Sequence, residues 1–256
     1  DINFLYVRAG EKIPAADLII LPGSKSVRAD LAFLKDHHWQ DAIQRHIRFG
    51  GKVLGICGGY QMLGEQIHDP LGSEGDAGSS EGLSLLSITT ELHKEKQLFN
   101  RDGMLSFNQA PISGYEIHTG ISKGRDCDNP FLYHEDLNEK TAEGAISECG
   151  NIAGTYWHGL FEKAESLHAI LAWAGLTSHQ TPDFSALREQ QIERLASEKS
   201  NAAFTLEPLD VTRALIHALE SKRPKLRYRI TTPTKLFAIF KRILPARLLD
   251  YLLAKG

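Results

Sequence analysis

Continuous apolar runs and stretches with helical spacing alternate along the first part of the chain. Residues 17–21 and 52–56 are two such runs, and apolar positions from 30 to 49 between them recur with helical spacing. Short continuous apolar runs are typical of strands buried on both faces. A strand, a helix and a second strand in this order indicate a parallel sheet. We therefore predict an α/β fold with a mostly parallel sheet flanked by helices.

Less regular patterns follow this unit. Residues 69–82 are rich in Gly, Ser and acidic side chains, which predicts a mobile, solvated flap, and the acidic residues from 74 to 81 belong to that flap rather than to a metal site. Strand-like alternation resumes at 83–88. The remaining predicted elements are strands that end at 114–118 and 154–158 and helices over 166–174 and 185–199.

The charge of the chain is unevenly distributed. Residues 222–256 hold ten Lys or Arg and one acidic residue, and the rest holds 19 basic and 31 acidic residues, so +9 and −12 give the net −3. A basic amphipathic tail of this kind can pack on its own acidic domain, dock on a partner or lie on an anionic membrane. Pro245 interrupts any single helix, which disfavours the membrane. We predict a domain over 1–205 and a helical extension with a basic tail over 206–256.

Composition limits the class of protein. No stretch approaches the roughly 18 consecutive apolar residues of a membrane-spanning helix, and there is no secretory signal. Three cysteines form an odd set without metal-like spacing, which fits a reducing compartment. We expect a cytoplasmic protein with no nucleic-acid partner. Because the chain starts without Met and close to a core strand, we also expect it to be the C-terminal piece of a longer protein.

The candidate chemistry centres on Cys57, which ends an apolar strand and is followed by Gly58 and Gly59. Glycines beside a nucleophile permit the tight strand-to-helix turn that lifts its side chain out of a sheet. Unpaired backbone N–H groups at the start of the helix favour the thiolate and can hold an oxyanion. A buried structural cysteine is the alternative, but such a residue does not require flanking glycines.

A cysteine nucleophile also needs a base. His158 is the best candidate, because an apolar stretch delivers it to a strand end beside Gly159. Alternatively, His158 is a structural histidine whose hydrogen bonds are satisfied within the core. None of the other histidines forms a convincing metal-binding pair, so we predict no metal.

The oxyanion hole and the substrate contacts have their own candidates. The backbone N–H of Gly58 is one donor, and the turn at Gly23 and Ser24 supplies a second. Gln61 stands one helical turn after Cys57, which predicts an amide at the pocket mouth that can bind a polar substrate such as glutamine.

Five motifs in order carry a family resemblance that covers about residues 17–200. They are PGSKS at 22–26, GICGGYQMLG at 55–64, DP at 69–70, GYEIH at 114–118 and GTYWHGLF at 154–161. On these residues the chain resembles the C-terminal glutamine amidotransferase domains of the cobyric acid synthase and cobyrinic acid diamide synthase family.

The resemblance implies a class I glutamine amidotransferase-like (flavodoxin-like) fold with a cysteine nucleophile elbow. In this family Cys57 would attack the side-chain amide of glutamine, form a γ-glutamyl thioester and release ammonia. His158 would protonate the ammonia and then activate water. The glutaminase domain needs no cofactor. Its partner would be an N-terminal ATP-binding synthetase domain, absent from this chain, to which ATP and Mg²⁺ belong.

The resemblance also implies an acceptor. The full enzyme would amidate carboxylates of the corrinoid adenosylcobyrinic acid a,c-diamide in cobalamin biosynthesis, and Gly-Ser-Lys after Pro22 favours this branch over the a,c-diamide synthase. There are four alternatives to this identification. The chain could be the glutaminase part of the a,c-diamide synthase, that of an amidotransferase for cell-wall precursors, a non-catalytic scaffold domain, or a cysteine-based redox protein on the same fold.

Four further residues receive roles from the resemblance. Triad glutaminases carry a glutamate where this chain has Leu160, so the third member is missing from its usual place. Glu116 is the candidate that orients the catalytic imidazole or faces the synthetase. The backbone around His118, Thr119 and Gly120 is the candidate for binding the α-amino and α-carboxylate groups of glutamine, or the side chains there face the channel to the synthetase.

Overall fold

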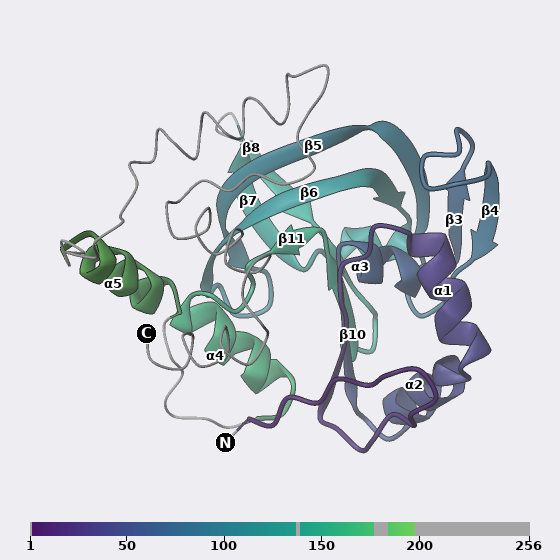
Figure 1. The fold of residues 1–256 in the computed structure, drawn as a ribbon, viewed down its shortest axis with the longest axis horizontal. Coiled ribbons are helices and arrows are strands. Elements are labelled where there is room, and N and C mark those ends of the chain that lie inside the picture. The colour runs from purple at the N-terminus through teal and green to yellow at the C-terminus, as the bar shows by residue number, and fades with distance from the viewer. Residues whose placement is uncertain (1, 137–138, 177–183, 198–256) are drawn as a thin grey trace, which may run out of the picture. The chain divides into compact units, whose positions relative to one another are not determined.

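The computed structural model describes residues 2–136, 139–176 and 184–197 (Figure 1). The chain divides into two compact units, Asp1–Glu189 and Gln190–Gly256. The predicted extension over 206–256, with its basic amphipathic tail, lies outside the described residues. Within the described ranges, no helix combines the length and apolar character that crossing a membrane requires.

A four-stranded sheet carries the predicted parallel strands. Its order is β1 (Leu18–Leu21), β2 (Lys52–Ile56), β10 (Ile152–Thr155) and β9 (Ala145–Ile146). The first three strands are parallel and β9 is antiparallel to β10. The α/β fold class and the strands predicted at 17–21 and 52–56 are confirmed.

Two helices replace the single helix predicted over 30–49. They are α1 (Val27–Asp36) and α2 (Trp39–Arg48). His38 separates them with a φ of 57°, a left-handed conformation that no helix can contain. Helical spacing persists across the break because both helices bury one face, which explains why the pattern concealed it.

Both faces of the four-stranded sheet are covered. Helices α1 and α2 lie to one side of β10 and α4 (Ala164–Trp173) lies to the other (Figure 1). Successive residues of β2 point to opposite faces. Val53 accordingly belongs to the core cluster of α1 and α2, and Leu54 belongs to the cluster that contains Ile170 of α4.

A second sheet was not predicted. It is mostly antiparallel, and a long pairing between two of its strands dominates it. Its main order is β11 (Trp157–His158), β6 (Pro111–Lys123), β5 (Thr89–Leu105), β3 (Gln66–Asp69) and β4 (Gly78–Glu81). The remaining elements are β7 (Leu132–Asp136), β8 (Glu139–Glu143), the short helices α3 (Gly58–Leu63) and η1 (Arg125–Asp128), and α5 (Phe184–Ser197).

The flap predicted over 69–82 is shorter in the structure: residues 70–77 form the loop of a β-hairpin between β3 and β4. Two of its acidic side chains bind backbone groups of the protein. Asp69 accepts hydrogen bonds from the backbone N–H groups of Ser73 and Glu74, and Glu74 accepts one from Val27 at 2.6 Å. Glu74 therefore caps the first turn of α1 rather than facing solvent alone.

The strand predicted at 83–88 is wrong. This segment has no sheet partner in the described structure, and its backbone N–H groups bond to the end of α3: Leu83 to the Met62 carbonyl and Leu86 to the Leu63 carbonyl. The alternation arises because Leu83, Leu86 and Ile88 are buried in the core. The 114–118 segment, predicted as a strand end, lies in the middle of β6.

Candidate active site

Cys57 occupies the turn between β2 and α3, with φ 52° and ψ −110°. A non-glycine residue at positive φ is strained and persists only where its surroundings hold it. Gly58 and Gly59, which follow Cys57, allow the close packing that keeps it in this conformation. A Cβ atom at Gly58 would lie 2.7 Å from the backbone nitrogen of Ser24, and one at Gly59 would lie 2.0 Å from the Leu21 carbonyl oxygen. Helix α3 therefore packs so closely on the preceding turn and on β1 that no side chain fits there.

Cys57 and His158 both lie close to Gly23. A Cβ atom added at Gly23 would lie 3.2 Å from Cε1 of His158 and 3.6 Å from Cβ of Cys57. These three residues come from the ends of three different strands: Gly23 follows β1, Cys57 follows β2 and His158 ends β11. Because β1 and β2 are parallel neighbours, Gly23 and Cys57 lie at the same edge of the four-stranded sheet, and β11, which follows β10 and pairs with β6 of the second sheet, adds His158.

The turn after β1 also presents its backbone to the elbow. The close approach of the Ser24 nitrogen to Gly58 places the two predicted oxyanion-hole donors side by side. Ser24 is fixed by its hydroxyl, which donates to Asp30 at 2.5 Å and accepts from the backbone N–H of Ser26 at 3.0 Å.

His158 is half-buried on β11, directly opposite Tyr115 of β6. The two rings stack with centroids 4.9 Å apart and planes 6° apart. Nε2 of His158 is buried and has no hydrogen-bond partner among the described residues. Burial lowers the pKa of His158, and the nearby charge of His118 lowers it further. The neutral imidazole, the form that can accept a proton, is thereby favoured.

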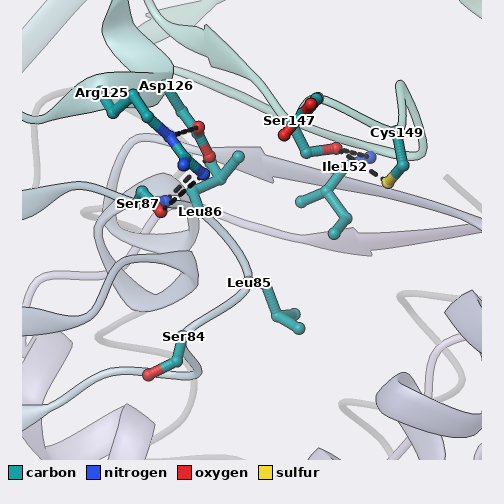
Figure 2. A pocket seen from close by; sticks show the side chains of 10 residues that line it. Ser84, Leu85, Leu86, Ser87, Arg125, Asp126, Ser147, Cys149 and Ile152 are labelled. Atoms are coloured by element: carbon teal, nitrogen blue, oxygen red, sulfur yellow. Dashed lines mark hydrogen bonds and ion pairs between the residues drawn. The ribbon is translucent and has the colours of Figure 1, made fainter.

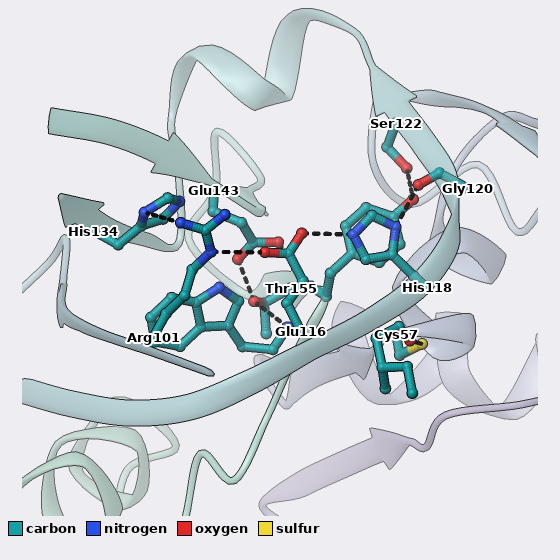
Figure 3. Close-up of polar contacts among 12 residues, drawn as sticks. Cys57, Arg101, Glu116, His118, Gly120, Ser122, His134, Glu143 and Thr155 are labelled. Carbon is teal, nitrogen blue, oxygen red and sulfur yellow. Dashed lines mark hydrogen bonds and ion pairs between the residues drawn. The ribbon is translucent and has the colours of Figure 1, made fainter. Parts of the chain in front are cut away.

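Glu116 does not orient His158, which corrects the sequence-based prediction. Side chains alternate along a strand, so Tyr115 and Glu116 point to opposite faces of β6. Since Tyr115 faces His158, Glu116 faces away and lies between Arg101 and His118 (Figure 3). Leu160, at the usual position of the triad glutamate, is buried in the core.

His118 is held from both sides. Its Nδ1 lies 2.6 Å from the Gly120 carbonyl oxygen, its Nε2 lies 2.5 Å from Oε1 of Glu116, and its ring stacks on Tyr156 at 3.8 Å. Both ring nitrogens can donate to oxygen at once only when the ring is protonated. Both ring nitrogens thus have partners within the protein, and half-buried Thr119 lies between His118 and Gly120 on β6. Binding of glutamine by this stretch of backbone stays a prediction.

Burial raises the pKa of Glu116, but the hydrogen bond to His118 and the positive charges of His118 and Arg101 outweigh it, so that the pKa is lowered overall. Nε of Arg101 lies 3.5 Å from Oε2 of the carboxylate. Glu116 is therefore an ionised centre between two cations.

The side chain of Gln61 is buried, and its binding of glutamine stays a prediction. Its Nε2 donates to the Tyr156 hydroxyl at 3.3 Å, and a Cβ atom at Gly120 would lie only 2.2 Å from that nitrogen. Ser122 bonds the same hydroxyl at 2.6 Å. Burial raises the pKa of Tyr156, which therefore stays neutral and anchors this group beneath the site.

Glu143 was missed by the sequence analysis. It is half-buried and accepts hydrogen bonds from the Thr155 hydroxyl and from the backbone N–H of Tyr156, at the junction between β10 and β11 (Figure 3). Burial raises its pKa to about 7. No motif surrounds Glu143 in the sequence, and only the pairing of distant strands brings it to the segment that carries His158.

A hollow of about 400 Å³ lies apart from these residues (Figure 2). It shares no lining residue with the group around Cys57, so it is not the candidate active site. Arg125 pairs with Asp126 at 3.6 Å, and Ser147 contacts Cys149 at 3.3 Å. Its lining residues are Ser84, Leu85, Leu86, Ser87, Arg125, Asp126, Ser147, Glu148, Cys149 and Ile152.

Cys57, Cys127 and Cys149 form no disulfide bonds. Among the residues that the structure describes, no group of three or more His, Cys, Asp or Glu side chains is arranged to hold a metal ion. The absence of a cofactor stays a prediction.

Three solved structures are similar to this chain at low sequence identity. One glutamine amidotransferase has 15% identity and a TM-score of 0.46 and covers 62% of this chain and 80% of its own. PurLQS from Thermotoga maritima has 17% identity and a TM-score of 0.47, covering 66% and 84%. A glutamine amidotransferase from the same organism has 16% identity and a TM-score of 0.38, covering 75% of each chain.

These likenesses are too distant to assign a function by themselves. The comparison with protein families is decisive, because it matches residues 1–166, more than half of the chain. The matched range contains the elbow, the turn after β1 and the strand that carries His158. The chain belongs to the CobB/CobQ-like glutamine amidotransferase family, as a glutamine-hydrolysing domain with the α/β class I amidotransferase fold.

Proposed function

We propose that Cys57 is the nucleophile and His158 the general base and acid of glutamine hydrolysis. The observation that carries this proposal is the position of Gly23, where an added Cβ atom would lie 3.2 Å from Cε1 of His158 and 3.6 Å from Cβ of Cys57. His158 takes the thiol proton, and the sulfur attacks the amide carbon of glutamine. The proton passes to the departing nitrogen, which leaves as ammonia from a γ-glutamyl thioester. Water then attacks the thioester, gives its proton to His158 and releases glutamate, and the thiol is restored.

The tetrahedral intermediates carry negative charge on the former carbonyl oxygen. The backbone N–H groups of Gly58 and Ser24 are the proposed donors to this oxygen, because the two backbones approach each other beside Cys57. The strained backbone conformation of Cys57, at the turn between β2 and α3, supports this arrangement.

We also propose that the ammonia serves an ATP-dependent synthetase domain that amidates corrinoid carboxylates, with adenosylcobyrinic acid a,c-diamide as acceptor. The support is the set of five motifs, in particular Gly-Ser-Lys at 23–25. ATP and Mg²⁺ would belong to that domain. The three cysteines form no disulfide bonds, which favours a reducing compartment, and the cytoplasm is the proposed location.

The first experiment measures ammonia release from glutamine by the full chain. Cys57→Ala should abolish it, whereas Cys149→Ala, which removes an exposed thiol outside the site, should leave it unchanged. A glutamine-like diazoketone should add once, on Cys57, as seen by intact and peptide mass. Turnover that survives Cys57→Ala would contradict the proposed nucleophile.

A second experiment tests the acceptor. The chain is combined with a separately produced corrinoid synthetase domain, ATP, Mg²⁺ and adenosylcobyrinic acid a,c-diamide. Glutamine-dependent amide formation, measured by mass, should require Cys57, while added ammonium salt should bypass it. Amidation of a cell-wall lipid precursor or of cobyrinic acid in a parallel reaction, with none of the a,c-diamide, would favour one of the other acceptors.

A further inference from the structure

The imidazole of His158 lacks the support that a catalytic histidine usually has. A base works best when one tautomer and one orientation are fixed, commonly by a carboxylate that accepts from the second ring nitrogen. Here Leu160 takes the position of that carboxylate, and Glu116 points to the other face of β6. Among the described residues, nothing hydrogen-bonds the buried Nε2 of His158.

The ring of Tyr115 stacks on the imidazole of His158, which has no such hydrogen bond at Nε2. It pairs with His158 in the antiparallel register of β6 and β11, and residues directly opposite each other in such a pair present their side chains on the same face. The rings lie only 6° from parallel, with centroids 4.9 Å apart, within the range of offset stacking.

The register that creates this stack is fixed by a glycine. A Cβ atom at Gly114 would lie 2.1 Å from the carbonyl oxygen of His158, so any side chain there would push β11 away from β6. A slip of one residue would turn Tyr115 to the opposite face. Gly114 therefore keeps Tyr115 directly over the imidazole.

Gly23 lies on another side of the imidazole. A Cβ atom added at Gly23 would lie 3.2 Å from Cε1 of His158. Tyr115 itself is 41% exposed, so its ring contributes little to the core and would be free to vary if it served packing alone.

We propose that Tyr115 is a positioning residue that fixes the plane of the His158 imidazole by stacking and so directs it toward Cys57. This inference rests on the proposed role of His158 as the base. The hydroxyl of Tyr115 takes no part, so the flat ring alone is required.

Three substitutions separate the flat ring from its bulk and its hydroxyl. Tyr115→Phe keeps the ring, Tyr115→Leu keeps much of the volume without a flat face, and Tyr115→Ala removes both. For glutamine hydrolysis by the full chain, Phe should retain at least about half of kcat. Leu and Ala should lower kcat by about tenfold to a hundredfold with KM nearly unchanged, because a misplaced catalytic group affects the chemical step.

A measurement that needs no turnover accompanies the kinetics. In a selectively labelled chain, a nuclear Overhauser contact between the Cε1 proton of His158 and the α protons of Gly23 reports the ring orientation. The contact should persist in Tyr115→Phe and vanish in Tyr115→Leu and Tyr115→Ala. A purely structural role would lower the melting temperature but leave this contact in the folded fraction.

The outcomes distinguish the inference from the proposed function. If His158→Asn abolishes hydrolysis while Tyr115→Leu and Tyr115→Ala keep wild-type kcat and the contact with Gly23, the stacking role is wrong and the base stands. If His158→Asn hydrolyses glutamine normally, the proposed base is wrong and the inference falls with it. Retention of the contact in Tyr115→Ala overturns the inference even in a chain that shows no turnover.

Discussion

Oε1 of Glu116 lies 2.5 Å from Nε2 of His118, two positions further along the same strand. Alternation along β6 puts both side chains on one face, where Arg101 completes a cluster of one anion between two cations. Between Glu116 and His118 lies Ile117, whose carbonyl oxygen is 3.5 Å from Sγ of Cys57. The cluster therefore fixes the stretch of backbone that meets the thiol.

Glu116→Gln should reduce the free energy of unfolding at pH 7 by about 1–3 kcal/mol, because it leaves His118 and Arg101 without their anion. The pKa of Glu116 is lowered below 4.5, so its stabilising contribution is present above that pH and is lost as the pH falls through the folded-state value. Urea unfolding at pH 7 and pH 3 should show the difference from wild type shrinking in acid.

A matched control for this cluster exists in the same strand pair. Glu91 and His93 are also two positions apart, at 3.8 Å, but both are well exposed. Glu91→Gln should change stability by less than about 0.5 kcal/mol. An equal loss in the two variants would show that burial of the Glu116 cluster does not matter.

Glu143→Gln should flatten the dependence of stability on pH. Because the pKa of Glu143 is raised from 4.5 to about 7, the folded protein binds a proton that the unfolded chain releases between these values. Stability then falls as the pH rises through this window, by up to about 1.4 kcal/mol per pH unit. Melting temperatures of wild type and Glu143→Gln from pH 4.5 to 8 test this; parallel curves would contradict it.

The pKa of His158 predicts the acid limit of activity. Since this pKa is lowered from 6.5, the imidazole stays neutral at pH values where an exposed histidine is already charged. The acid limb of kcat/KM for glutamine should therefore have its midpoint below 6.5. The same shift makes stability fall as the pH drops below this value, because the unfolded chain then binds the proton more readily. A midpoint above 6.5 would mean that another group sets the limb.

Gly23→Ala should impair catalysis without unfolding the protein. The added methyl group would lie 3.2 Å from the His158 ring and 3.6 Å from Cβ of Cys57, in the space where the two side chains and the substrate meet. Glutamine hydrolysis should fall by at least about tenfold, since small displacements of catalytic groups have large effects. The melting temperature should change little; full activity in Gly23→Ala would exclude this crowding.

Gly59→Ala should act on the fold instead. Its methyl group would lie 2.0 Å from the Leu21 carbonyl oxygen, and backbone of a buried strand cannot move aside as a side chain can. We expect destabilisation of about 3 kcal/mol or more, measured by urea unfolding, as for severe overpacking. A stable Gly59→Ala variant would show that α3 can shift away from β1.

Local patterns were sufficient to predict the elbow and the sheet beneath it. The apolar run over 52–56 and the glycines after Cys57 reflect nearest-neighbour sterics and burial on both faces, which any fold must satisfy. Helical spacing likewise identified the helices, but it did not reveal the break at His38, because a single left-handed residue leaves the apolar face on both sides intact.

The sequence by itself determined the nucleophile turn, the candidate base and the motifs of the family, since each is written in a few adjacent residues. The tertiary structure alone decided that Glu116 serves His118, that Glu143 supports the strand junction and that Tyr115 covers His158. The last two of these relationships depend on strand pairing across 12 to 43 residues of sequence, and the first depends on which face of β6 Glu116 and His118 share. A one-residue change of register would reverse every one of those faces while leaving the local pattern unchanged.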